Sequence, residues 1–307
     1  MEYLKQKAAQ LPLTPGIYLM KDQHGQIIYV GKAKNLKNRV QSYFRHNPNH
    51  SNKVLRMIFN IVDFETIDVQ TELDALLLEC QYIQRYHPLY NRQMNYYQNY
   101  LYVGIVADEI VLSPEYRTGF WGPFRQYKSL PDLVICLNDT FLLPKTNHLT
   151  RLAIQRQLPQ LEDMAIDQRL KSIKGLFTGR STDYFQLLEA RIRHASEHLN
   201  FELAGKLQAD FQHAQQLYDY ILRRKTFLKQ KELIFSLPIT TDENDPRKKY
   251  YQVSYGRIIQ TKVADEQPDF QPPKQKNSHL EKAEVDPTDI LISYYRRFIQ
   301  PAKSRKV

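Results

Sequence analysis

Several side chains that could act on phosphate lie close together near the start of the chain. Tyr18 and Tyr29 are eleven positions apart, each near a glycine, and Lys32 follows soon after. Arg39 and Tyr43 are four residues apart, a spacing that places both on one face of a helix. Phenols and cations gathered in this way indicate a pocket that faces phosphate groups.

The segment around these residues is basic. Between positions 23 and 62 it contains no aspartate and no glutamate. Its cationic side chains are Lys32, Lys34, Lys37, Arg39, Arg45, Lys53 and Arg56. We interpret this run as a surface that contacts the backbone of a nucleic acid.

One carboxylate, Glu79, falls at or beside the apolar stripe of a predicted helix. Leu76 precedes it by three residues and Ile83 follows by four. Burying a carboxylate is costly unless it is paired or binds a metal. Two interpretations therefore fit the spacing: Glu79 holds a divalent metal through oxygen, or it pairs with Arg85 or Lys32 at the edge of the stripe.

A short α/β arrangement would position these side chains. The runs 16–20 and 26–30, joined by a glycine-containing loop, predict a β-hairpin, and 33–44 predicts a helix, with Lys32 at the turn between them. A helix over 51–60 and a strand over 63–69 should follow. Residues 71–86 predict the strongest helix, with Thr71 as N-cap, Asp74 in an approximate capping box and Pro88 ending it.

The rest of the chain predicts smaller units, so that the expected fold class is α+β. A small sheet should surround FWGPF at 120–124, with a helix near 128–137 and short helices over 147–180. Residues 182–232 should form two helices broken near Asn200, and 250–263 a β-hairpin. A helix over 286–298 precedes a basic tail. We expect domains at 1–98, 99–180, 181–232 and 233–307.

Composition limits the classes of protein to consider. A net charge of +10 and a pI of about 9.3 favour a polyanionic partner, although a solvated basic surface gives the same totals. Cys80 and Cys136 are too few and too far apart for a disulfide framework. The chain shows no apolar signal region and no run of 18 apolar residues, so we expect a cytoplasmic protein without membrane contact.

The strings PGIY, YVGKAKNLKNRVQSYF, TELDALLLE and HPLYN resemble the amino-terminal domain of UvrC-type excinucleases, within the GIY-YIG nuclease superfamily. That family makes the incision 3′ to a DNA lesion in nucleotide excision repair. The match covers about 100 residues and implies a small antiparallel sheet flanked by helices. It also implies one divalent metal, Mg²⁺ or Mn²⁺, held by Glu79.

The resemblance assigns roles to the other residues of the pocket. Arg39 would hold the non-bridging phosphate oxygens, and Tyr29 would be the general base, with Lys32 and the metal favouring its phenolate. Tyr18 and Tyr43 would orient water and phosphate, and Asn91 would brace the Glu79 helix or the pocket wall. The residues expected to contact DNA are Gly31, Lys34, Lys37, Arg45 and Lys53.

Beyond position 100 the resemblance is weaker. The word GFWGPFRQY is similar to a family "GPY" segment, and residues 140–180 lack the cysteines of an iron–sulfur site, so no such cluster is expected. LNFELAGKLQAD at 199–210 resembles the UVR motif, through which UvrC meets UvrB. Phe201 would be the anchor, with Leu199, Ala204 and Leu207. Periodicity alone equally fits an ordinary two-helix core.

These observations predict a shortened, Cho-type relative of UvrC without an RNase H-like nuclease. It would be a monomeric, metal-dependent endonuclease that cuts damaged double-stranded DNA when UvrB recruits it. Two alternatives belong to other classes. One is a DNA-binding adaptor with a silent pocket, against which the complete set of pocket residues argues. The other is a mobile-element endonuclease, which would require a DNA-reading element that the sequence does not show.

Overall fold

The computed structural model describes residues 1–45, 50–239, 245–274 and 279–299. The chain forms two compact units. The first contains Met1–Tyr97, Leu228–Ser278 and Ala283–Val307, and the second contains Gln98–Phe227 and His279–Lys282. The first segment of this unit ends at Tyr97, and the sequence predicted a first domain of residues 1–98. The other divisions differ, because the second unit joins 99–180 with most of 181–232, and the first unit includes the carboxyl-terminal sheet.

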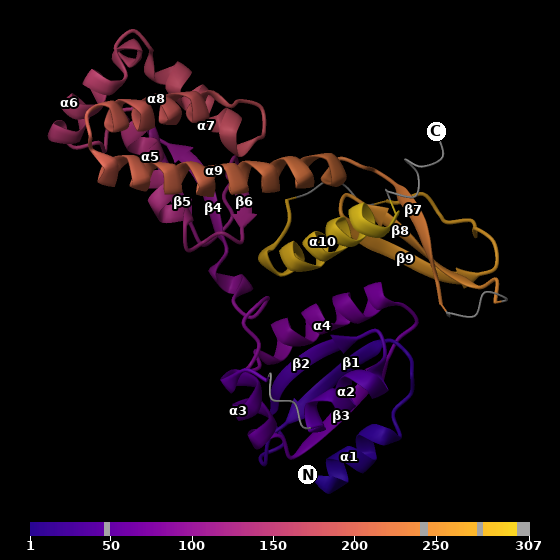
Figure 1. The fold of residues 1–307 in the computed structure, drawn as a ribbon. Coiled ribbons are helices and arrows are strands. Elements are labelled where there is room, and N and C mark those ends of the chain that lie inside the picture. The colour runs from indigo at the N-terminus through magenta and orange to yellow at the C-terminus, as the bar shows by residue number, and fades with distance from the viewer. Residues whose placement is uncertain (46–49, 240–244, 275–278, 300–307) are drawn as a thin grey trace. The chain divides into compact units, whose positions relative to one another are not determined.

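The amino-terminal part of the first unit has the order α1 (Glu2–Ala9), β1 (Gly16–Lys21), β2 (Ile27–Ala33), α2 (Leu36–Phe44), α3 (Asn52–Asn60), β3 (Asp63–Asp68) and α4 (Glu72–Tyr86). The strands form an antiparallel sheet in the order β2-β1-β3. The predicted hairpin, helices and strand are all present (Figure 1). Helix α1 was not predicted.

Strand β1 is buried on both faces because helices cover each side of the sheet. On one face, Tyr18 and Met20 join a core with α1, α2 and α3. On the other, Ile17 and Leu19 pack with Ile83 of α4. Alternate side chains of a strand point to opposite faces, so these two sets belong to different layers. This explains why the first strand reads as a continuous apolar run.

The carboxyl-terminal part of the first unit is a second antiparallel sheet. It consists of β7 (Leu233–Pro238), β8 (Lys248–Ser254) and β9 (Arg257–Ala264), in the order β7-β8-β9. The predicted hairpin corresponds to β8 and β9, whereas β7 was not predicted. Helix α10 (Lys282–Tyr294) and a π-helical turn (Tyr295–Ile299) follow. The predicted basic tail lies outside the described residues.

The second unit combines a sheet with a layer of helices. Strands β4 (Leu101–Val106), β5 (Glu109–Ser113) and β6 (Trp121–Phe124) pair in the order β5-β4-β6. The helices are α5 (Leu130–Thr140), α6 (His148–Gln157), α7 (Ile166–Phe177), α8 (Asp183–Glu197) and α9 (Phe201–Leu228). One core contains buried side chains from the sheet and from all five helices. The α8–α9 hairpin therefore belongs to this unit.

The break between α8 and α9 lies where the sequence predicts it. Leu199 has a positive φ of 57°, which the helical backbone does not allow. The side chain of Asn200 then accepts a hydrogen bond from the Leu203 backbone N–H at 3.1 Å, which starts α9 as an N-cap does. Among the described residues, no helix combines the length and apolar character needed to cross a membrane.

Candidate active site

Three of the predicted catalytic residues come together where β1 meets α2. The hydroxyl oxygens of Tyr18 and Tyr43 are 2.8 Å apart, and Nε of Arg39 donates to the Tyr18 hydroxyl at 3.2 Å. The Arg39 guanidinium also lies over the Tyr43 ring, 5.1 Å from its centroid. Tyr29 packs against both phenols, with ring centroids 6.0 and 6.5 Å away. Spacing in the sequence predicted this convergence, and the structure confirms it.

Gly31 leaves room for a side chain of this cluster. It pairs with Tyr18 across the β1–β2 ladder. A Cβ at position 31 would overlap the hydroxyl and ring of Tyr18. The space that glycine leaves is thus filled by the chain's own tyrosine, which corrects the prediction that Gly31 admits the DNA backbone.

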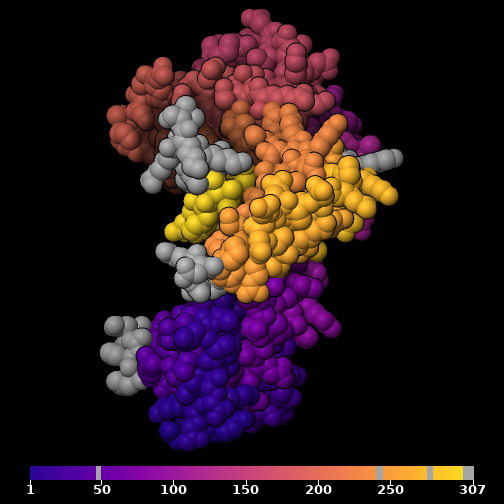
Figure 2. Space-filling model, turned by 90° about the vertical axis from the view of Figure 1, so that its right-hand side faces the viewer, coloured from indigo at the N-terminus to yellow at the C-terminus, as the bar shows by residue number. Residues whose placement is uncertain are grey.

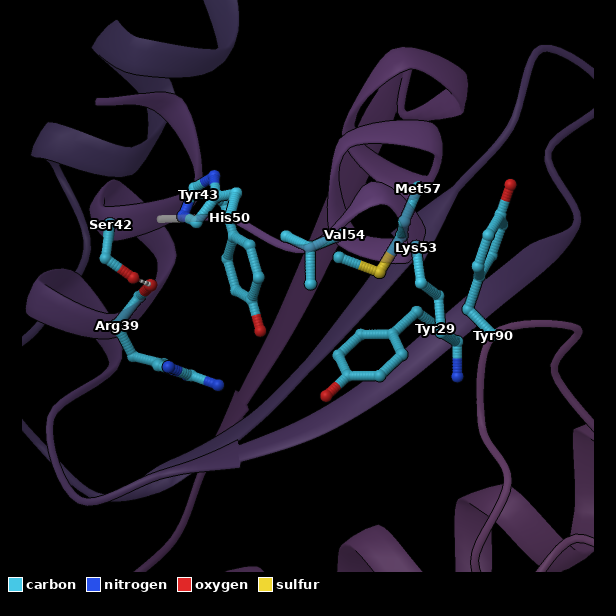
Figure 3. A pocket seen from close by; sticks show the side chains of 9 residues that line it. All are labelled: Tyr29, Arg39, Ser42, Tyr43, His50, Lys53, Val54, Met57 and Tyr90. Carbon is cyan, nitrogen blue, oxygen red and sulfur yellow. Dashed lines mark hydrogen bonds between the residues drawn. The ribbon is translucent and has the colours of Figure 1, made fainter. Parts of the chain in front are cut away.

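A cavity of about 470 Å³ opens beside these residues. Figure 3 shows the Arg39 guanidinium and the hydroxyls of Tyr29 and Tyr43 directed toward the same space. The complete lining is Tyr29, Arg39, Ser42, Tyr43, His50, Lys53, Val54, Met57 and Tyr90. Sequence reasoning missed Ser42, His50 and Tyr90. Ser42 and Tyr90 lie within the strings YVGKAKNLKNRVQSYF and HPLYN, which could have indicated them, whereas His50 lies outside every string that resembles the family.

Tyr29 is the phenol best placed to meet a substrate. It is half-buried and lines the cavity, whereas Tyr18 is fully buried and does not. Burial raises the pKa of Tyr29 strongly, and the neighbouring Tyr43 and Glu79 raise it further. The Lys32 ammonium, which was expected to favour the phenolate, forms an ion pair with Glu72.

Lys32 and Lys34 share a carboxylate that sequence reasoning overlooked. Oε1 of Glu72 accepts from Lys32 Nζ at 2.7 Å, and Oε2 accepts from Lys34 Nζ at 2.9 Å. Glu72 lies in the first turn of α4, and these two lysines lower its pKa against the opposing effect of burial. The basic run is therefore partly neutralised from within the fold.

Glu79 reaches the end of β2 from α4, on the opposite face of the sheet from α2. Its Oε1 accepts a hydrogen bond from the backbone N–H of Lys32 at 3.0 Å. Burial raises the pKa of Glu79, although that hydrogen bond, Lys32 and Arg39 lower it. The expected ion pair with Arg85 or the Lys32 side chain is not what the structure shows. Oε2 makes no hydrogen bond among the described residues.

This carboxylate suits a hard cation that keeps most of its own water. The described residues contain no group of three or more histidines, cysteines, aspartates or glutamates able to enclose a metal. Mg²⁺ is commonly held by one or two carboxylates, with water and substrate phosphate completing the shell. A single partly buried carboxylate with a free oxygen, beside a phenol and an arginine, fits that mode of binding.

Asn91 braces the pocket wall. Its Oδ1 accepts from the Val30 N–H and its Nδ2 donates to the Val30 carbonyl, both at 2.9 Å. The side chain thereby pairs with the free edge of β2 as a neighbouring strand would. Among the described residues, these bonds join Asn91 to β2, which adjoins the pocket, and not to α4.

The remaining cations predicted to contact DNA are spread around this region. Lys53 lines the cavity, and burial together with Arg92 lowers its pKa. Arg45 is exposed and its guanidinium donates to Gln41 at 2.9 Å. Lys37 is half-buried on α2 and Lys34 is exposed. Only Lys53 among them reaches the cavity.

The residues predicted to bind a partner divide into two groups. Leu199 and Phe201 are 74% and 67% exposed at the α8–α9 turn. Ala204 and Leu207 are 9% and 3% exposed and lie inside the second unit. Because these two side chains of α9 point toward neighbouring elements of the same unit, their burial corrects the prediction that they contact a partner. Only the two residues at the turn are available to another molecule.

Comparisons with known proteins agree with this geometry. Residues 14–92 match the family model described as a UvrC-like GIY-YIG domain. The UvrABC system protein C of Desulfitobacterium hafniense is 35% identical over 219 residues, covering 66% of this chain and 36% of that protein. Its counterpart in Clostridium acetobutylicum is 29% identical over 271 residues, covering 81% and 43%. The chain thus spans about two fifths of these relatives' length.

Similar solved structures include the GIY-YIG N-terminal endonuclease domain of UvrC from Thermotoga maritima, bound to its catalytic divalent cation, magnesium. That domain is 40% identical to this chain. The matched region covers 30% of this chain and 99% of that domain. The TM-score is 0.28.

Proposed function

We propose that this chain, whose residues 14–92 match the UvrC-like GIY-YIG domain, is an endonuclease of DNA repair. It hydrolyses a phosphodiester of damaged double-stranded DNA, on the 3′ side of the lesion, and depends on a divalent metal. A basic chain of net charge +10 suits that polyanionic substrate.

The observation that carries this proposal is the convergence around one cavity. Tyr29, Tyr43 and Arg39 face it, while Glu79 arrives at the adjoining end of β2 from another layer. A structural role for each tyrosine would not require a carboxylate beside the strand that bears Tyr29. A phosphodiester hydrolase requires both a proton acceptor and a group that binds a cation.

The chain's own residues divide the work between orientation and proton transfer. Arg39, held by the Tyr18 hydroxyl, presents a fixed guanidinium to the non-bridging oxygens of the phosphate. Tyr43 fixes Tyr18 through their shared hydrogen bond and lines the cavity beside Arg39. Tyr29 takes the proton of the attacking water. Its raised pKa makes the neutral phenol the resting form.

Glu79 would hold the metal through its free oxygen. When bound there, a divalent cation would neutralise charge on the phosphate and the leaving oxygen, and would favour the Tyr29 phenolate. Mg²⁺ or Mn²⁺ both suit an oxygen ligand of this kind.

UvrB is the proposed recruiting partner, through the α8–α9 turn. Leu199 and Phe201 place two large apolar side chains at an exposed turn, within a segment that resembles the UVR motif. Exposed apolar side chains at a helix hairpin are typical of a docking site for another helical element.

The decisive experiment is incision of an end-labelled duplex that carries one bulky lesion, with and without UvrB and Mg²⁺. The proposal expects a single Mg²⁺-dependent cut on the 3′ side, stimulated by UvrB. Binding to the duplex without cutting, in Mg²⁺ or Mn²⁺ and with UvrB present, would instead identify a silent adaptor.

A further inference from the structure

The helix that carries Glu79 begins in a hydrogen-bonded network shared with the carboxyl-terminal sheet. Thr71 is the N-cap of α4 and forms a capping box with Asp74. The Tyr251 hydroxyl of β8 lies 2.6 Å from Thr71 Oγ1 and donates to Asp74 Oδ1 at 3.1 Å. Lys249, also on β8, donates to Asp74 Oδ2 at 3.0 Å. About 180 residues of sequence separate the two sides.

The network leaves each of its polar groups satisfied. If the Thr71 hydroxyl donates to Tyr251 and Tyr251 donates to Asp74, the Thr71 oxygen remains free to accept the Asp74 N–H at 3.1 Å. Asp74 Oδ2 also accepts the Thr71 N–H at 3.2 Å. Burial, followed by Asp74, raises the pKa of Tyr251, so its hydroxyl stays protonated and able to donate. Closed networks of this kind hold one arrangement rigidly.

Further packing and hydrogen bonds hold the two sides of this network in place. Lys249 and Tyr251 lie two apart on β8 and so share one face of the sheet. Tyr251 is 1% exposed and its ring stacks on Phe235 of β7, with centroids 5.1 Å apart. At the other end of α4, Gln84 donates to the Ala283 carbonyl at 3.2 Å. In the space-filling view, orange carboxyl-terminal residues border the purple residues of the amino-terminal part (Figure 2).

We propose that Tyr251 and Lys249 are positioning residues for the nuclease site, which hold the start of α4 so that Glu79 meets the end of β2. This inference rests on the proposed function. Glu79 lies five residues after Asp74, about 7.5 Å along a helix. A displacement of the cap therefore moves the carboxylate, and a change of about 1 Å at such a site costs much of the activity. Glu72, which holds Lys32 and Lys34, lies between the cap and Glu79 and would move with them.

The test compares Tyr251→Phe with Tyr250→Phe. Both variants lose one phenolic oxygen from neighbouring buried positions of β8, but Tyr250 points to the opposite face. We would measure Mn²⁺ affinity by calorimetry, hydrogen exchange of the Asp74 and Ala75 amides, and the Mg²⁺ concentration for half-maximal cutting. Tyr251→Phe should weaken Mn²⁺ binding roughly tenfold, the lower end of what outer-shell partners of metal ligands contribute. It should also speed exchange at both amides.

Tyr250→Phe should leave all three measurements at their wild-type values. A folded Tyr251→Phe protein with unchanged Mn²⁺ affinity and unchanged exchange would overturn the inference. If Tyr251 only stabilised the fold, Tyr251→Phe would reduce the fraction of active protein and would leave the Mg²⁺ concentration for half-maximal cutting unchanged. If Tyr251→Phe does not fold, Lys249→Met decides in its place, with the same direction of change expected. A wild-type protein that binds Mn²⁺ but never cuts contradicts the proposed function alone.

Discussion

At the scale of single residues, Glu79 and Tyr29 are held where burial disfavours their charged forms. A site that binds a cation and removes a proton needs both groups ionised during the reaction. Ionising either group is therefore less favourable in the fold than in water, as is common where function and stability compete. Substitutions that alter a single oxygen atom of Glu79 or of Tyr29 can therefore test the roles assigned to these two residues.

The first prediction concerns the metal ligand. Glu79→Gln keeps the size of the side chain but removes its charge, so it should abolish Mg²⁺-dependent cutting. DNA binding should stay near the wild-type level, because the substitution removes no cation. Single-turnover cutting and a filter-binding assay measure the two effects separately. Cutting at close to the wild-type rate in Mg²⁺ would refute the role of Glu79.

The second prediction follows from the raised pKa of Glu79. The folded state binds this proton more tightly than the unfolded state, whose glutamate has a pKa of about 4.3. Stability is therefore lost as pH rises through the window between that value and the raised one. Glu79→Gln should raise the Tm of the metal-free protein at neutral pH, and the gain should shrink towards about pH 4.5, near the reference value.

Thermal unfolding in the presence of a chelator, at neutral pH and at about pH 4.5, tests whether Glu79→Gln raises the Tm as predicted. Asp68→Asn on the exposed end of β3 makes the same chemical change outside the pocket and serves as the control. A Glu79→Gln protein less stable than the wild type at neutral pH would show that the carboxylate is favourably paired.

The third prediction concerns the proposed base. Only the phenolate of Tyr29 accepts a proton, and its pKa is raised, so the cutting rate should climb about tenfold per pH unit across neutral pH. Tyr29→Phe should lower the rate by roughly 10²–10⁴-fold, the usual range for a general base, and should flatten the profile. Single-turnover rates against pH test both points. A Tyr29→Phe enzyme with the wild-type slope would exclude Tyr29 as the base.

At the scale of elements, the β1–β2 pair is built around one close approach. Gly31→Ala would drive a methyl group into the Tyr18 ring and hydroxyl, and so would disturb the Tyr18–Tyr43 hydrogen bond. We expect a loss of about 1–3 kcal/mol of stability, typical of overpacking, together with a loss of cutting. Chemical denaturation measures the first effect.

Gly205→Ala is the matched control for that variant. Gly205 is exposed within α9, and a Cβ there would meet nothing within 4 Å. Replacing a helical glycine by alanine stabilises by about 0.4–1 kcal/mol when the conformation allows it. Opposite signs at the two positions are the expected result. A Gly31→Ala protein as stable as the wild type would show that the Tyr18 side chain can move aside without loss of stability.

At the scale of the whole molecule, the proposed nuclease site and the proposed docking turn belong to separate units. Phe201 is 67% exposed in the second unit, whereas Leu207, six residues later, is 3% exposed. Phe201→Ala should change stability by no more than about 0.5 kcal/mol, as for most surface positions. It should weaken UvrB binding by about 2 kcal/mol, as an interface anchor does. Calorimetric titration with UvrB measures this loss.

Leu207→Ala should do the reverse. It removes a buried side chain and should cost about 2–5 kcal/mol of stability. UvrB affinity of the folded fraction should stay unchanged. If Phe201→Ala binds UvrB as tightly as the wild type does, the α8–α9 turn is not the docking site.

The sequence by itself determined most of the first hundred residues. The hairpin, α2, β3 and the capping box of α4 depend on local periodicity and local hydrogen bonds, which a short window contains. The spacing of Tyr18, Tyr29, Arg39 and Tyr43 on two strands and a helix of regular geometry predicted that they lie together, whereas spacing left two interpretations of Glu79 open. The family resemblance then named their chemistry.

Only the tertiary structure decided which groups pair across elements. Glu72 binds Lys32 and Lys34, and Tyr18 fills the space beside Gly31. His50 and Tyr90 line the cavity, although neither of them was assigned a role there from the sequence. The tertiary structure also joined the carboxyl-terminal sheet to α4 through Tyr251 and buried Ala204 and Leu207. Such contacts depend on how layers that are distant in sequence pack together. The hydrophobic effect is non-directional, so a local sequence pattern, which reveals periodicity, does not reveal which residues a buried side chain will contact.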